Sequence, residues 1–435
     1  MKQFFFTVIL IFSGYILTLN AQDSGHLKDK AMEEFKNENY PKAIQIIKSA
    51  LKENPDDADI YFYLGFFTHY NAYDSRPLEG YNASYSDTVF NYLDKAIELN
   101  PNHGDAKYFY AAEAGAAALN TVRTGRSEKF KFYYQKAYNK GAFPDWALEY
   151  GKITLDLCDK DALLFTHGDF ILNVCWYLQF IENYRTDISV IPLALMDRPW
   201  FAIALKKGSI FKNVNMSVTK NQLIDMHPYK WDSTLIQINV PESLKKKYNL
   251  PLDFKMKWFV NPDFTTNRII NKINSEKAKP RTYLSAHRAM LLNIIETNQW
   301  ERPVYFTAGF EEFYLAGLDK NFQHGGLVSK LLPFETDGTV WEFDFMALEK
   351  LVFDVSYQNY KKVLDDNQPR VSKILNTYKS PFWILAHHYK ENGEAKKLAK
   401  LIENYKNKMI IGFYSNYEKQ ILESLENLKT NNHNF

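Results

Sequence analysis

Cysteine is nearly absent from this 435-residue chain, which contains only Cys158 and Cys175. A disulfide-rich secreted scaffold is therefore excluded, and no cysteine–histidine spacing resembles a zinc site. Charge of one sign is also lacking: the net charge is +2, so the sequence has no electrostatic footprint for nucleic acid or anionic lipid. There is no G-x-S-x-G elbow, P-loop or G-x-G-x-x-G motif, so no cofactor and no metal is predicted.

Long apolar runs are confined to the start of the chain. Lys2 precedes the nearly continuous apolar run Phe4–Leu19, and Leu19-Asn20-Ala21 completes the layout of a signal peptide over residues 1–21. No later run approaches about 18 uncharged apolar residues. We therefore expect an exported protein, periplasmic or associated with the outer envelope, with no membrane span after cleavage. An uncleaved anchor is the alternative. In such a compartment the two cysteines are either bridged or remain buried thiols.

Residues 24–150 follow the spacing of tetratricopeptide-like helical hairpins. In the first unit, Ala43 and Ala50 let paired helices approach closely and Pro55 stops the second helix. A longer second unit carries a polar and aromatic insertion over 73–86, and a third pair follows. Stacked pairs bury a continuous core and leave a surface that suits peptides. Aromatic residues, at 16%, suit such surfaces as well as cores. The helices predict a protein or peptide partner; the alternative is that they merely support the following domain.

The stretch Asp161–Met196 predicts a strand, a helix and a second strand. Ala162–Thr166 and Ile188–Leu195 are apolar runs on either side of Phe170–Tyr184, which has helical spacing. Two continuous apolar strands around one helix favour a parallel pair that is covered on both faces. We therefore predict an α/β fold with α-helical repeats, in which a central, mostly parallel sheet occupies residues 155–340.

Ligands of open α/β sheets bind beyond the carboxyl ends of the strands. His167, Gly168 and Asp169 follow the first strand, Asp197 follows the second, and Glu311 follows a third predicted strand. The candidate catalytic residues are Asp169 with His167 or Asp197, as acid/base groups. The candidate binding residues are Gly168, Asp169, Asp197 and Glu311. Two structural alternatives stay open, because Asp169 can cap the following helix and His167 can simply be hydrogen-bonded at the strand end.

Further elements follow from periodicity and from proline and glycine positions. The last part, 341–430, is expected to be helical and to end in a hairpin like those of the N-terminal repeats. Strands are predicted at Leu235–Val240, Phe254–Val260, Val304–Ala308 and Leu327–Leu332, and helices at Thr265–Ser275, Thr282–Asn298, Phe345–Val355, Tyr357–Leu364 and within Pro381–Lys408.

Four runs carry a family resemblance: LLFTHGD, CWYLQFIENYRTDISVI, LLNIIETNQWERPVYFTAG and AGLDKNFQHGGLVSKLLP. In this order they resemble the soluble C-terminal domain of bacterial multi-spanning membrane proteins related to protein O-mannosyltransferases. Those proteins have a lipid-sugar-dependent, GT-C-like glycosyltransferase fold. The resemblance covers most of Asp161–Pro333 in patches, and it implies a role near glycan or protein handling at the cell envelope.

Three departures limit what this resemblance implies. The membrane-embedded part, which holds the family's catalytic carboxylate and lipid-linked donor, is absent from the sequence. The family's polar pair after Gly-Asp is replaced by Phe170-Ile171, and its polar residues after the second strand by Ala194, Leu195 and Met196. We therefore predict a non-catalytic binding or scaffold protein with a protein, peptide or glycan partner. The alternative is a carbohydrate-active enzyme that transfers or hydrolyses glycosyl groups.

The two readings differ in the crevice that they require. A binding protein predicts a crevice that is shallow or plugged by Phe170 and Met196. An enzyme predicts a deep polar pocket with two carboxylates about 5–9 Å apart, as in glycoside chemistry.

Overall fold

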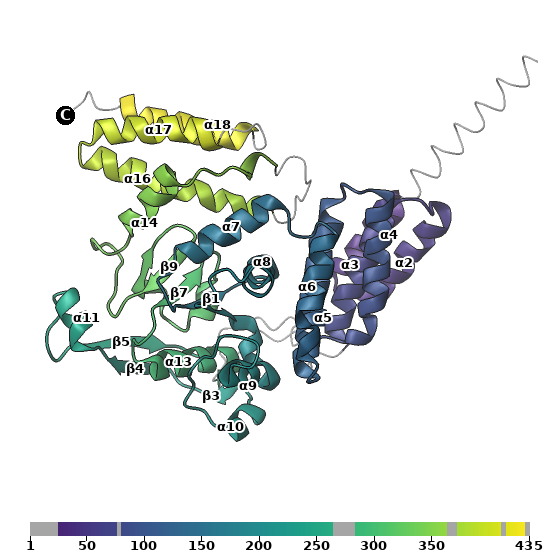
Figure 1. The fold of residues 1–435 in the computed structure, drawn as a ribbon, viewed down its shortest axis with the longest axis horizontal. Helices are drawn as coiled ribbons and strands as arrows, with labels where there is room; N and C mark the ends of the chain where they lie inside the picture. The colour runs from purple at the N-terminus through teal and green to yellow at the C-terminus, as the bar shows by residue number, and fades with distance from the viewer. Residues whose placement is uncertain (1–24, 76–79, 264–282, 363–371, 410–414, 431–435) are drawn as a thin grey trace, which may run out of the picture. The chain divides into compact units, whose positions relative to one another are not determined.

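The computed structural model describes residues 25–75, 80–263, 283–362, 372–409 and 415–430 (Figure 1). They form two compact units, and each is considered by itself. The helical unit comprises the described residues of Met1–Pro144. The sheet unit comprises those of Asp145–Lys362 and Lys373–Phe435. The predicted signal peptide and the helix expected at Thr265–Ser275 lie outside the described residues.

The helical unit is a series of helices in which each packs on the next along the chain. The predicted insertion contributes only a short 3₁₀ turn to the described part, η1 (Ala83–Tyr85). The helices are one over 25–36, then α2 (Tyr40–Glu53), α3 (Ala58–Asp74), α4 (Ser86–Leu99), α5 (Gly104–Arg123) and α6 (Phe130–Asn139).

Small residues set the spacing of these helices. Ala43, Ala50 and Ala96 are fully buried, as the sequence pattern requires. A Cβ on Gly65 of α3 would lie 2.8 Å from Cδ2 of Leu93 on α4, so a larger side chain would push the two helices apart. Small residues therefore allow the close approach of neighbouring helices in this unit.

A carboxylate is buried in the middle of the helical unit. Glu113 of α5 is fully buried, and its Oε2 lies 2.8 Å from Nδ1 of His69 on α3. Tyr81, from the insertion, donates its hydroxyl proton to the other carboxylate oxygen, and Ser86 lies 3.3 Å from the Tyr81 hydroxyl. Burial and the Glu113 charge hold the pKa of Tyr81 well above its usual range. The insertion is thus tied into the core of the unit.

A central sheet organises the sheet unit. Its strands are β1 (Leu163–Thr166), β2 (Ser189–Pro192), β7 (Val304–Thr307), β8 (Phe322–His324) and β9 (Val328–Leu331), in the order β2-β1-β7-β9-β8. β1 is parallel to β2, with Leu164 opposite Val190, and parallel to β7 on its other side. The predicted parallel pair is confirmed.

The expectation of a mostly parallel sheet is wrong. β9 runs antiparallel to both β7 and β8, so the sheet is mixed. β8 and β9 are joined by a short turn through Gly325 and Gly326, and so short a connection permits only antiparallel neighbours. The coarser prediction, a mixed α/β fold, holds.

Helices lie on opposite sides of this sheet, as Figure 1 shows for α7 (Asp145–Asp156) and α13 (Ala286–Asn298). α7 packs on α8 (Asp169–Phe180), where a Cβ on Gly151 would lie 2.5 Å from Val174. α13 packs on the 3₁₀ turn η3 (Leu193–Asp197), which continues into α9 (Pro199–Lys207). The strand–helix–strand unit predicted from the sequence is therefore covered on both faces.

A two-stranded hairpin extends from this core. β4 (Thr234–Asn239) and β5 (Lys255–Val260) pair antiparallel, within one residue of the predicted strands. Gly317, at φ 85°, supports β5: a Cβ there would lie 2.2 Å from the carbonyl oxygen of Phe259. The connecting elements are α10 (Lys220–Ile224), α11 (Glu242–Lys247) and the small pair β3 (Tyr229–Lys230) and β6 (Tyr283–Leu284).

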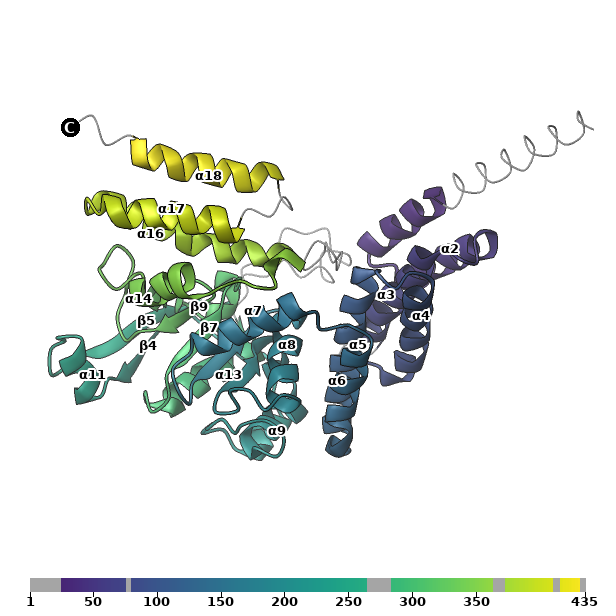
Figure 2. The same ribbon diagram turned by 45° about the horizontal axis from the view of Figure 1, so that its top comes forward.

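The C-terminal helices belong to the sheet unit, and Figure 2 shows them stacked beside one another. The helix predicted at Phe345–Val355 is an α-helix that continues as a π-helix, and Tyr357–Leu364 contributes only a short 3₁₀ turn to the described part. The elements are α14 (Phe345–Glu349), η8 (Ser372–Lys379), α16 (Ser380–Glu391), α17 (Ala395–Met409) and α18 (Ser415–Thr430). Within the described ranges no helix combines the length and the apolar character needed to cross a bilayer.

Candidate functional site

The residues singled out in the sequence follow parallel strands, so they lie at one edge of the sheet, the carboxyl edge. Gly168, at φ 87°, is the N-cap of α8, and Asp169 is its exposed first residue. A carboxylate at this position is favoured by the helix dipole, and the cap itself is the glycine. Asp197 ends η3, while Glu311 is exposed beyond β7.

Aromatic and imidazole rings pack together at the carboxyl edge. The His167 ring centroid lies 5.2 Å from that of Phe310 and 5.0 Å from that of Tyr314. Tyr314 also contacts His287 of α13, with centroids 5.3 Å apart. The His167 backbone N–H donates to Oγ1 of Thr307, 3.3 Å away, at the end of β7. Side chains from three separate segments thus fill this part of the edge.

The carboxylates of Asp197 and Glu311 both affect the pKa of Tyr314. Burial, followed by the charges of Glu311 and Asp197, raises the pKa of Tyr314. Burial also raises the pKa of Asp197 itself, although Nε of Arg198 lies 3.2 Å from its Oδ1. The pKa of His287 is shifted in the opposite direction. Burial lowers it to about 4, so the imidazole is neutral at pH 7. The structure therefore brings Asp197, Glu311 and both histidines around Tyr314.

Some buried polar atoms at this edge have no aligned hydrogen-bond partner among the described residues. They are Oγ1 of Thr166 at the end of β1 and Nε1 of Trp200 in α9, whereas Oδ1 of Asp197 has the ion pair to Arg198. An unpaired buried polar group costs on the order of 1–3 kcal/mol, which a ligand with hydroxyl groups would offset. No group of His, Cys, Asp and Glu in the described ranges is placed to hold a metal ion.

Phe170 and Met196, the two residues expected to plug the crevice, differ in position. Phe170 does not plug the carboxyl edge, since its ring stacks on Trp146 of α7 with centroids 5.6 Å apart. Met196 is fully buried in the packing beneath the edge. Rings therefore pack around Tyr314 at this edge, and buried polar atoms beside them have no hydrogen-bond partner in the described part of the chain.

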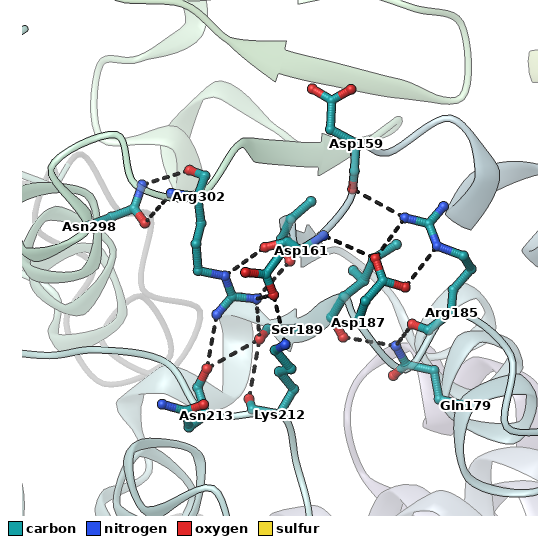
Figure 3. A network of polar contacts seen from close by, with 12 residues as sticks. Asp159, Asp161, Gln179, Arg185, Asp187, Ser189, Lys212, Asn213, Asn298 and Arg302 are labelled. Atoms are coloured by element: carbon teal, nitrogen blue, oxygen red, sulfur yellow. Dashed lines mark hydrogen bonds and ion pairs between the residues drawn. The ribbon is translucent and has the colours of Figure 1, made fainter. Parts of the chain in front are cut away.

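The opposite, amino edge of the same strands is held by Arg302, which precedes β7 (Figure 3). Its Nε donates to the Asp161 carbonyl over 2.6 Å, and its Nη2 to the Ser189 hydroxyl over 2.8 Å and the Ala162 carbonyl over 3.0 Å. Nη1 donates to the Asn213 carbonyl over 3.0 Å. One guanidinium therefore links the starts of all three parallel strands.

A second guanidinium completes this amino-edge network. Arg185 donates from Nε and Nη2 to the two carboxylate oxygens of Asp187, over 2.9 and 3.0 Å. Asp187 also accepts the backbone N–H of Asp161 over 3.0 Å. The Arg185 contact lowers the pKa of Asp187 to about 2. Asp187 thus pairs with Arg185 through both carboxylate oxygens and ties the segment before β2 to the start of β1.

The two cysteines are free thiols, and both are buried. Burial raises the pKa of each thiol well above its usual range. Of the two alternatives left open by the sequence, the structure has the buried thiols.

Comparison with known proteins gives one family. The family model described as TMEM260-associated domain 2 matches residues 147–261 and 245–350, which together span less than half of the chain. The matched region contains the parallel strands, both edges and the β4–β5 hairpin. No curated protein and no solved structure matches the chain.

Sequence reasoning missed several residues at these edges. Tyr314 and Trp200 lie among other aromatic residues and carry no local motif. Arg302 was visible only as the residue before a proline that introduces a strand, and its backbone acceptors have no sequence signal. His287 lies within the predicted helix Thr282–Asn298, and the helix pattern does not show that it contacts Tyr314.

Proposed function

We propose that this protein is an exported, non-catalytic binding or scaffold protein, accessory to envelope protein or glycan handling. Its tetratricopeptide-like helices hold a protein or peptide partner. The observation that carries the proposal is the exposure of aromatic side chains on α3: Tyr70 is 39% and Tyr73 is 38% exposed. Exposed tyrosines offer large, rigid contact area together with a polar tip, which is typical of recognition surfaces.

The support beneath these tyrosines is rigid. The Tyr70 ring lies 5.1 Å from the rings of Phe35 and Phe66, and Tyr73 lies 5.2 Å from His69. His69 is held in turn by the buried Glu113. A preorganised surface loses little side-chain entropy on binding, which favours affinity.

The test is capture of partners from envelope extract by residues 22–435, followed by identification of what co-purifies. Changing Tyr70→Ala and Tyr73→Ala together should abolish specific capture. Phe132→Ala, which removes a 61% exposed aromatic residue from α6, is the matched control and should leave capture unchanged. Capture that survives the tyrosine changes but is lost with Asp169→Asn would contradict the proposal.

A carbohydrate-active enzyme is the second candidate, favoured by one observation. Asp197 and Glu311 lie close to Tyr314, beside the Thr166 hydroxyl, which has no hydrogen-bond partner among the residues that the structure describes. In this alternative the acid/base groups are Asp169 with His167 or Asp197. Release or transfer of sugar from envelope glycans, lost with Asp197→Asn and with Asp169→Asn, would support this alternative. Absence of turnover at any pH between 5 and 8 would favour the binding protein.

A further inference from the structure

A groove of about 690 Å³ lies in the sheet unit between β4 and α13, away from the carboxyl edge. Pockets of a few hundred to about a thousand Å³ are the size at which proteins hold ligands. Its floor is apolar, formed by the buried side chains of Trp258, Leu284 and Met290. Its rim is polar and includes Asp225, Gln222, Lys230 and Glu296.

The groove runs along the backbone edge of β4. It is lined by three consecutive residues, Leu235, Ile236 and Gln237. Successive side chains of a strand point to opposite faces, so contact with three in a row places the groove at the strand's edge. β4 pairs with β5 on its other side, and within the described ranges no strand pairs with the edge that faces the groove.

This edge is not protected in the usual way. Natural proteins blunt exposed edges with lysine, proline or bulges, because unpaired N–H and C=O groups template pairing with another chain. β4 reads TLIQIN and has neither charge nor proline, whereas its partner β5 carries Lys255 and Lys257. Leu235 is 49% exposed at this unprotected edge. β4 therefore lacks the features that prevent an exposed strand edge from pairing with another chain.

The opposite wall of the groove presents an unused acceptor. Nδ2 of Asn293 on α13 donates to the Ser217 hydroxyl over 2.6 Å, which fixes the orientation of the amide. Its Oδ1 is buried and has no donor among the described residues. One helical turn away, Ala289 leaves room beside this amide. A ligand that brings an N–H group would satisfy the acceptor.

Two tryptophan side chains form hydrogen bonds with the backbone at the ends of the β4–β5 hairpin. Trp300 donates to the carbonyl of Asn239, the last residue of β4, over 3.0 Å. Trp231 donates to the carbonyl of Val260, the last residue of β5, over 2.8 Å. Since β4 and β5 are antiparallel, these contacts lie at opposite ends of the hairpin and hold it in place.

We propose that the groove between β4 and α13 binds an extended peptide, which adds to the free edge of β4 as a third strand. Main-chain hydrogen bonds to alternate residues of β4 supply affinity, and alternate apolar side chains of the peptide face Trp258, Leu284 and Met290. The site lies in the sheet unit, so it is separate from the partner surface proposed for α3, and either can fail without the other.

The test begins with a phage-displayed library of random nonapeptides selected against residues 22–435. The selected peptides should carry apolar residues at alternate positions. N-methylation at every second position, which removes a ladder donor, should weaken binding at least 10-fold, and methylation of the positions between should have little effect. Amide exchange of β4 should slow when the peptide is bound.

Variants locate the site. Ala289→Trp fills the groove and should weaken binding at least 10-fold, and Asn293→Leu, which removes the acceptor, should weaken it several-fold. Leu252→Trp, at an 83% exposed position outside the groove lining, is the matched control and should bind as the unmodified chain does. A thermal melt of each variant shows whether the fold is retained.

Four results would overturn the proposal. They are N-methylation without alternation, Ala289→Trp binding as well as the unmodified chain, self-association of the chain that Ala289→Trp abolishes, and oligosaccharide binding at the groove without peptide binding. A fifth result, peptide capture that is lost only with the Tyr70 and Tyr73 changes, would overturn the groove proposal but leave the proposed function intact.

Discussion

The two edges of the parallel strands are built from opposite chemistry. At the amino edge, Arg302 and Arg185 join the strand starts through hydrogen bonds to carbonyls and to Asp187. At the carboxyl edge, packed rings surround Tyr314, Asp197 has an ion pair to Arg198, and the Thr166 hydroxyl has no hydrogen-bond partner among the described residues. Hydrogen bonds therefore join the strand starts at the amino edge, whereas ring packing dominates the carboxyl edge.

Substitutions at the two edges should therefore affect different properties of the protein. Changes at the amino edge should reduce stability, because they remove contacts that are fully formed in the protein alone. Changes at the carboxyl edge should alter ligand binding with a smaller effect on stability, because much of the polar capacity there is unused.

Arg302→Ala should have the largest effect. It removes four hydrogen bonds to backbone and Ser189 acceptors. We expect a loss of about 3–4 kcal/mol in the free energy of unfolding, measured by urea denaturation at pH 7. The matched control is Arg198→Ala at the carboxyl edge, where the ion pair to Asp197 is partly exposed and the expected loss is below about 1 kcal/mol. Equal losses in the free energy of unfolding for the two variants would show that the edges do not differ in their contribution to stability.

Asp187→Asn should have the next largest effect, about 2 kcal/mol at pH 7. The folded pKa of Asp187, about 2, lies below its unfolded value, so the carboxylate stabilises the fold above the unfolded pKa. This contribution is lost as the pH falls from about 4 towards 2. Urea denaturation at pH 7, 4 and 3 should therefore show a shrinking difference between Asp187→Asn and the unmodified chain. A difference that does not change with pH would contradict the assignment.

His287→Gln tests the carboxyl edge in a separate pH window. The folded pKa of His287, about 4, lies below its unfolded value near 6.5, because burial favours the neutral ring. The unfolded chain takes up the proton first, so stability falls as the pH drops from about 6.5 to 4 and no further below. We expect about 1–2 kcal/mol of this decline to disappear in the variant. An unchanged pH profile between 7 and 4 would show that the imidazole is not held neutral.

Tyr314→Phe should have the smallest effect on stability, about 0.5 kcal/mol or less, because the ring contacts with His167 and His287 persist. A thermal melt measures this change. If the carboxyl edge takes a hydroxylated ligand, the same variant weakens that binding several-fold. A loss of about 2 kcal/mol or more in stability, with ligand binding unchanged, would instead show that the Tyr314 hydroxyl stabilises the fold.

Local patterns were enough to predict the parallel pair and many of the other elements, but not α7, α9 or β8. Apolar runs around a helical stretch predicted β1 and β2, and the carboxyl-edge position of His167, Asp197 and Glu311 followed from their parallel order. The antiparallel half of the sheet was missed, since a single short apolar run does not show which neighbour it pairs with.

The sites themselves depend on contacts between distant segments. Arg302 binds carbonyls more than 100 positions earlier in the chain, and a carbonyl is available at every residue, so no pattern reports the contact. The groove along β4 is similar: alternation predicted the strand, but nothing local says that one of its edges faces α13.

The Tyr81–Glu113 contact in the helical unit has an evolutionary consequence. Tyr81 lies in the segment by which the second helical pair is longer than the first, and it contacts the buried Glu113 together with His69. A relative with a shorter loop would leave the buried Glu113 carboxyl group with His69 but without Tyr81 as a hydrogen-bond partner. Loss of the loop and replacement of Glu113 should therefore occur together in descendants of this chain.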